Sequence, residues 1–161
     1  MGREDRKKRL EFLIQARKQK EEKEQREKRI VEMLALFPGK NNVEILDEIQ
    51  SDKIERDMTD CFPIASWGRI DWEKVNNKLI IPTKETSSIP TILLNQSMDT
   101  TVPVYLMVGE YQYPVVKTTL LTILECIEGV MYIGPDQWIY CPSLRYVIEF
   151  CHDDEVGIGW M

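Results

Sequence analysis

The amino-terminal segment is the part of this sequence that most constrains its fold. Residues 3–36 contain no proline and no interior glycine and are rich in Lys, Arg, Glu, Gln and Leu, which predicts one long helix. From Gln15 to Arg29 the only apolar residue is Ala16, so the sustained apolar seam of a coiled coil is absent. We therefore expect a solvated, charged helix attached to one compact domain.

The end of this helix is predicted from apolar and helix-breaking residues. The apolar cluster between Ile30 and Phe37 is expected to pack on the domain, and Pro38 with Gly39 is expected to end the helix. The chain has 161 residues, 43% of them hydrophobic, which is enough for one core. The predicted division is a charged helical leader over residues 1–37 and a compact acidic α+β domain over residues 38–161.

Charge is distributed unevenly along the chain. Residues 1–30 hold 12 basic and 7 acidic side chains, a net charge of +5, whereas the remainder carries −11. Between residues 85 and 161 the only cations are Lys117 and Arg145, against ten carboxylates, which predicts a basic protein partner for this half. The alternative is that the acidic surface only keeps the domain soluble. With a net charge of −6, nucleic-acid binding is expected only through the amino-terminal helix.

Alternating apolar runs and turn signals predict the rest of the fold. Helices are predicted at 42–57 and 117–128, and strand-like runs at 79–81, 89–94, 102–108, 113–116, 130–133, 137–141, 145–151 and 156–160. The last two runs are joined by residues 152–155, which predicts a hairpin turn. The expected fold is α+β: the charged amino-terminal helix and the second helix, followed by a mostly antiparallel sheet with one inserted helix.

The sequence contains little that indicates catalysis. Cys151 and His152, the only histidine, are adjacent, but neighbouring strand residues point to opposite faces, so a nucleophilic pair is not favoured. Asp153, Asp154 and Glu155 lack the spacing of a calcium loop, and no glycine-rich phosphate loop is present. We predict no enzyme, no metal site and no cofactor, although a cysteine or metal hydrolase stays open as a third reading.

The cysteines and the hydropathy pattern predict where the protein resides. The four cysteines form no CxxC pair, and we expect them to be small core residues in a reducing cytoplasm. No apolar run resembles the core of a signal peptide or reaches the length of about 20 residues that a membrane span needs. A monomer and a homodimer are both compatible with the pattern.

Aromatic and acidic residues lie together in the acidic half. Tyr and Trp supply rigid contact area, and carboxylates attract Lys or Arg of a partner, so together they predict a protein-binding surface. The alternative is that most of the rings belong to the core. The candidate partner-binding residues are Glu110, Tyr111, Tyr113, Asp136, Trp138, Asp153, Asp154 and Glu155.

The carboxy-terminal runs show a family resemblance. Residues 138–142, 146–152 and 156–159 resemble the carboxy-terminal sheet of small bacterial toxin-immunity domains, over about residues 100–160. The resemblance implies a cytoplasmic, non-catalytic protein that blocks one toxin by stoichiometric binding, and an acidic body suits a basic, nuclease-like toxin. The alternative function is a nucleic-acid- or ribosome-associated adaptor that uses the basic amino-terminal helix.

Overall fold

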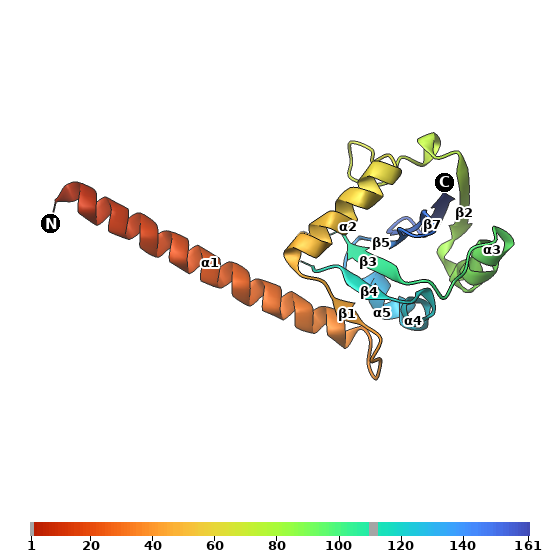
Figure 1. Ribbon diagram of the computed structural model, residues 1–161, viewed down its shortest axis with the longest axis horizontal. Coiled ribbons are helices and arrows are strands. Elements are labelled where there is room, and N and C mark those ends of the chain that lie inside the picture. Colours follow the sequence, from red (N-terminus) through yellow and green to blue (C-terminus); the bar gives the residue numbers. More distant parts are fainter. Residues whose placement is uncertain (1, 110–112) are drawn as a thin grey trace.

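A computed structural model describes residues 2–109 and 113–161 and shows one long helix projecting from a sheet that helices cover on both faces (Figure 1). The elements in chain order are α1 (Arg3–Ala35), β1 (Glu44–Ile45), α2 (Glu48–Cys61), the 3-10 helix η1 (Trp72–Lys74), β2 (Asn77–Pro82), the 3-10 helix η2 (Thr83–Ser88), α3 (Ile89–Asn95), β3 (Val104–Val108), β4 (Val116–Thr118), α4 (Leu120–Glu125), α5 (Ile127–Tyr132), β5 (Asp136–Cys141), β6 (Tyr146–Cys151) and β7 (Glu155–Trp160).

Within the described residues the sheet has seven strands, in the order β1-β4-β3-β5-β6-β7-β2. Every pairing is antiparallel, and the β6–β7 hairpin pairs Phe150 with Val156 around the turn predicted at residues 152–155. The predicted α+β class, with an amino-terminal helix and an antiparallel sheet, is confirmed.

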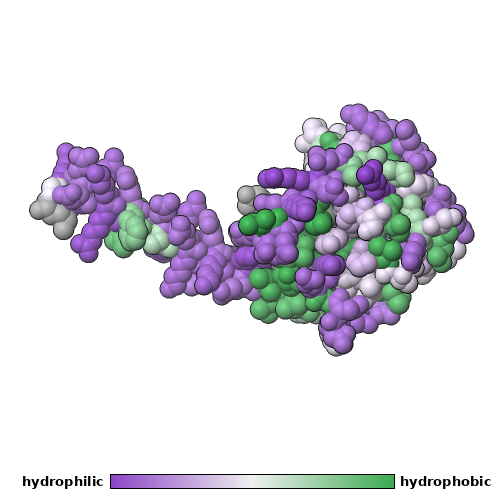
Figure 2. Space-filling model, in the orientation of Figure 1, coloured by the Kyte–Doolittle hydropathy of each residue, from purple (hydrophilic) through white to green (hydrophobic). Residues whose placement is uncertain are grey.

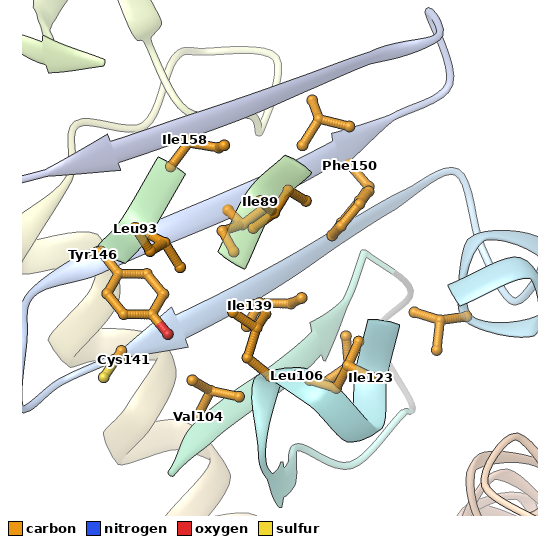
Figure 3. Close-up of a cluster of buried hydrophobic side chains, with 14 of the residues drawn as sticks. Ile89, Leu93, Val104, Leu106, Ile123, Ile139, Cys141, Tyr146, Phe150 and Ile158 are labelled. Carbon is orange, nitrogen blue, oxygen red and sulfur yellow. The ribbon is translucent and has the colours of Figure 1, made fainter. Parts of the chain in front are cut away.

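Two apolar clusters lie on opposite faces of the sheet because strand side chains alternate between faces. The larger cluster packs Ile139 and Phe150 against residues of α3 and α4, such as Leu93 and Ile123 (Figure 3). The smaller cluster packs Tyr140 and Val147 against Met58 of α2 and against Phe62, the residue that follows this helix. The central strands are therefore covered on both faces, which accounts for the buried pattern along the whole of β6.

The long helix α1 joins the domain only near its end. Met33 and Phe37 enter the larger cluster with exposed fractions of 0% and 3%, as the apolar pattern predicted. Four large apolar side chains nearer the amino terminus stay exposed: Leu10, Phe12, Leu13 and Ile14. Figure 2 shows them as one apolar patch on an otherwise hydrophilic shaft. No helix among the described residues is long and apolar enough to cross a membrane.

Several predicted elements were wrong in type or position. Residues 89–94 form helix α3 rather than a strand, because Pro90 fits the first turn of a helix while Ile89 and Leu93, four residues apart, enter the core together. Residues 130–133 lie in and at the end of α5 rather than in a strand, and α5 continues through Gly129. The predicted helix 117–128 is divided at Cys126 into α4 and α5.

The second helix starts later than predicted. Asp47 caps it, accepting a hydrogen bond from the Gln50 N–H at 2.8 Å, while the Gln50 side chain accepts from the Asp47 N–H at 3.2 Å. The preceding residues Glu44 and Ile45 pair with β4 instead of joining the helix. Similarly, the run predicted at 113–116 contributes only Val116 to β4. The composition of these short segments did not distinguish the two alternatives.

Candidate partner-binding surface

A groove of about 710 Å³ lies between α1, α2 and one face of the sheet. Among the described residues, four carboxylates line it, from Glu22, Glu48, Asp52 and Glu55, whereas the only lining cation is Arg26. Apolar lining includes Met58 of α2, Met107 of β3 and Trp138 of β5. The groove therefore combines negative walls with an apolar and aromatic lining.

Helix α2 supplies three of the four carboxylates from one of its faces. Glu48, Asp52 and Glu55 are spaced by four and three residues, which places them together on the helix surface. Met58, three residues after Glu55, lies beside this face, lines the groove and packs against the sheet. The pKa of Glu55 is raised, first because the surrounding protein removes part of its hydration and then because the charge of Asp52 lies close by.

Helix α1 forms the other wall, and two of its arginines attach it to the domain. We call these contacts the clasp; it consists of Arg26, Arg29 and Glu32 of α1 with their partners in the domain. Arg26 donates to the Leu46 carbonyl at 3.2 Å and lies 3.6 Å from the Glu48 carboxylate. Arg29 donates to the Tyr113 hydroxyl at 2.9 Å, and its guanidinium lies 4.7 Å from the centre of that ring.

The clasp is completed by the carboxylate of Glu32. It accepts from the Tyr113 hydroxyl at 2.8 Å and from Arg29 at 2.9 Å. The pKa of Glu32 is lowered, chiefly by these hydrogen bonds from Arg29 and Tyr113. Tyr113 thus lines the groove and also holds α1 in place.

A second hollow, of about 810 Å³, lies along α2 and differs in charge. Its acidic residues are balanced by an equal number of basic ones: Asp52, Asp57 and Asp60 against Lys53, Arg56 and Lys117. Among the described residues, the first groove, with four carboxylates and one cation, therefore carries the larger excess of negative charge.

Glu149 is a buried carboxylate beside the groove, with an exposed fraction of 1%. One oxygen, Oε2, accepts from the Ile70 N–H at 2.9 Å and from the Trp138 indole N–H at 2.7 Å. The other, Oε1, accepts from the Trp72 indole N–H at 2.9 Å and from Arg69 at 3.4 Å. These four donors satisfy the buried charge and fix the orientation of both indoles.

Glycines make room for the Trp72 indole on β7. A Cβ placed on Gly157 would overlap the indole ring, and one on Gly159 would come within 2.8 Å of it. The two glycines at alternate positions of this strand therefore allow Trp72 to lie flat on the sheet and reach Glu149.

The predicted binding residues occupy three separate environments. Trp138 and Tyr113 line the groove. Asp136 and Asp153 flank Arg69, at 4.0 Å and 3.3 Å from its nitrogens. Asp154 and Glu155 are exposed in the β6–β7 hairpin, where Asp154 has a φ of +59°. Glu110 and Tyr111 lie outside the described residues.

The structure places Cys151 and His152 differently from the sequence-based expectation. Their side-chain ligand atoms lie within 4.8 Å of each other, because strand β6 ends at Cys151 and the alternation of faces stops there. The pKa of the Cys151 thiol is raised, chiefly by burial, which disfavours the thiolate that a nucleophile requires.

Sequence reasoning missed the acidic face of α2 and the donors around Glu149. The spacing of Glu48, Asp52 and Glu55 was a usable signal, since it predicts one helical face. Arg69 and Trp72 are about 80 residues from Glu149 in sequence, and no local pattern connects them.

The fold and the groove define a small α+β protein with an acidic, partly apolar groove on one face of its sheet. A family model described as "CdiI immunity protein EcoliA0-like" matches residues 38–159, and the chain belongs to this family of immunity proteins. The match extends beyond the carboxy-terminal residues 100–160 that carry the resemblance, and it includes α2. No curated protein matches the chain at a significant level. Family membership assigns the chain to proteins that bind and neutralise toxins and are generally non-catalytic.

Proposed function

We propose that this protein neutralises a basic, nuclease-like toxin in the bacterial cytoplasm by stoichiometric binding in the acidic groove. The observation that supports the proposal most is the excess of carboxylates over cations in a groove with an aromatic lining. Such a surface attracts a Lys- and Arg-rich site that evolved to bind phosphates, and it competes with the nucleic acid for that site.

Trp138 is the proposed anchor of the interface. It is half-buried, and its indole N–H is held by Glu149, so binding costs little side-chain entropy. The exposed carboxylates Asp153, Asp154 and Glu155 extend the surface, because Gly68 lines the groove and the next residue, Arg69, pairs with Asp153.

The test begins with recovery of the toxin by affinity capture from the native host, with nuclease treatment. Binding of the purified toxin is then measured by calorimetry for the wild type and for E48Q/D52N. The matched control, D60N/E128Q, removes the same charge from exposed positions outside the groove. We expect the affinity of the groove variant for the toxin to fall about tenfold or more, equivalent to roughly 1.4 kcal/mol. This loss of affinity should be larger at low salt than at high salt, because salt screens the interaction between charges. Equal affinities of the two variants would reject the groove as the binding site.

The adaptor function is the second candidate, since the basic residues near the start of α1 are exposed and remote from the groove. Replacing Arg6, Lys7, Lys8 and Arg9 by Gln leaves the groove intact. Nuclease-sensitive association that disappears in this variant, together with unchanged affinity in E48Q/D52N, would favour the adaptor function over inhibition.

A further inference from the structure

Three side chains of different chemistry converge where β5 and β6 meet the β6–β7 hairpin. A carboxylate oxygen of Asp136, Sγ of Cys151 and an imidazole nitrogen of His152 all lie within 4.8 Å of one another. We propose that these three atoms bind a zinc-type divalent cation and leave a further coordination position open toward the exposed hairpin. The proposal is independent of toxin binding.

The fold explains why these residues meet. Asp136 and Cys151 are direct partners in the β5–β6 register, so their side chains lie on the same face of the sheet. His152 is the first residue beyond β6, and its Nδ1 lies 3.5 Å from Oδ1 of Asp136. In tetrahedral zinc sites, with bonds of about 2.0–2.3 Å, ligand atoms are about 3.3–3.8 Å apart. Only small side-chain adjustments are needed to reach this geometry.

The donor set selects the class of metal. Thiolate and imidazole ligands suit zinc and similar transition metals, whereas calcium and magnesium prefer oxygen ligands only. The Asp153 N–H donates to Sγ of Cys151 at 3.3 Å, an interaction that stabilises the negative charge of a metal-bound thiolate. Oδ1 of Asp136 is buried and has no hydrogen-bond partner among the described residues, so it is available as a ligand.

The local charge also favours a bound cation. Arg69 is the only arginine or lysine in the ion-pair network that joins Asp136, Glu149 and Asp153 among the described residues. Its nitrogens lie at 3.4 Å and 3.3 Å from Glu149 and Asp153 but only reach 4.0 Å from Asp136. A divalent cation between Asp136 and Cys151 compensates the excess negative charge that Arg69 leaves.

The open position faces the exterior. The side chains of His152 and Asp153 are each 60% exposed, so the cation is accessible to water or to a donor atom from another molecule. Cys151 is buried and Asp136 is nearly so, which anchors the cation from the sheet side. The arrangement of three protein ligands and one open position is that of a reactive or interfacial zinc site rather than a closed structural one.

The test uses the full chain, freed of metal, and Co²⁺ as a spectroscopic probe. Binding through Cys151 is expected to give a sulfur-to-cobalt charge-transfer band in the near ultraviolet with one equivalent of cobalt, and Zn²⁺ is expected to remove it. The C151S variant should lose the band, and H152Q and D136N should weaken cobalt binding about tenfold or more. The controls are C126S, which alters a thiol elsewhere, and D154N, which alters the same hairpin; both should bind like the wild type.

Folding is checked separately by circular dichroism of each metal-free variant. His152 is exposed, so H152Q is expected to keep the wild-type spectrum and melting temperature, and it keeps the test valid if C151S does not fold. At the same Zn²⁺ concentration the melting temperature should rise more for the wild type than for H152Q. A charge-transfer band that survives in C151S, or equal cobalt affinities in wild type, H152Q and D136N, would identify adventitious binding only and reject the site.

Discussion

The buried carboxylate of Glu149 offers the sharpest test of the energetics of this fold. In E149Q one oxygen becomes an amide nitrogen, which cannot accept a hydrogen bond. In one orientation of the amide the Ile70 and Trp138 N–H groups lose their acceptor, and in the other those of Trp72 and Arg69 do. Either way two donors remain unpaired in a buried environment.

The magnitude follows from these contacts. A hydrogen bond to a charged acceptor contributes about 1.5–3 kcal/mol, so the loss of two gives a destabilisation of about 3–6 kcal/mol. For a domain of this size each kcal/mol corresponds to about 2–4 °C, and the melting temperature should fall by roughly 6–24 °C.

Urea unfolding followed by far-ultraviolet circular dichroism measures this loss without relying on the fluorescence of the affected tryptophans. The control E128Q makes the same change at an exposed position and should stay within about 0.5 kcal/mol of the wild type. W138F removes one donor, and combined with E149Q it should cost less than the sum of the two single changes. A loss below 1 kcal/mol for E149Q, or strict additivity with W138F, would contradict the hydrogen-bond network described above.

Three further variants test other contacts. G157A places a methyl group against the Trp72 indole and should destabilise the domain by about 1–3 kcal/mol in urea unfolding, whereas G39A, in a turn with free space but a positive φ of +70°, should cost less. Y113F removes the hydroxyl that links Arg29 to Glu32 and should cost about 1 kcal/mol and speed amide hydrogen exchange at the end of α1; unchanged exchange there would count against the clasp. Folding raises the pKa of Glu55, which means that the ionised carboxylate is less favourable in the folded state than in the unfolded state. Ionised Glu55 therefore destabilises the fold at a pH above its folded-state pKa, and this cost is absent at a pH below its unfolded-state pKa. E55Q should therefore raise the melting temperature at pH 7 by about 1 °C and give no gain below about pH 4, and a gain that persists at pH 3 would refute this cause.

The sequence was most informative where local pattern and tertiary environment agree. The two apolar runs near the carboxy terminus, separated by a polar segment, predicted the β6–β7 hairpin. Both strands are covered on both faces, so each is a nearly continuous apolar run, and the turn between them is polar. It was least informative at Ile89–Leu94, where β-branched residues favour a strand but Pro90 and the four-residue spacing of Ile89 and Leu93 favour a helix. The core contacts of those two side chains decided between the alternatives.

In the candidate site, too, local sequence predicts some features, and tertiary contacts decide the others. A lone acid within the apolar run of β6 indicates a buried, partnered carboxylate, but its partners come from a loop that only the folded chain brings near. The acids of α2 are visible as one helical face, yet their role depends on α1 returning alongside them to form the second wall. Long-range contacts of this kind are not encoded in any short window of sequence.

The stability of the domain and the shape of its proposed binding surface depend on one shared residue pair. Trp138 lines the groove with its ring and is tied to Glu149 by its N–H, while Glu149 is itself fixed by Trp72 and the Ile70 backbone. A half-exposed tryptophan in solution otherwise samples several rotamers, which raises the entropic cost of binding. The buried carboxylate therefore preorganises the groove, because removing it frees the indole of Trp138, which is proposed as the anchor of the interface.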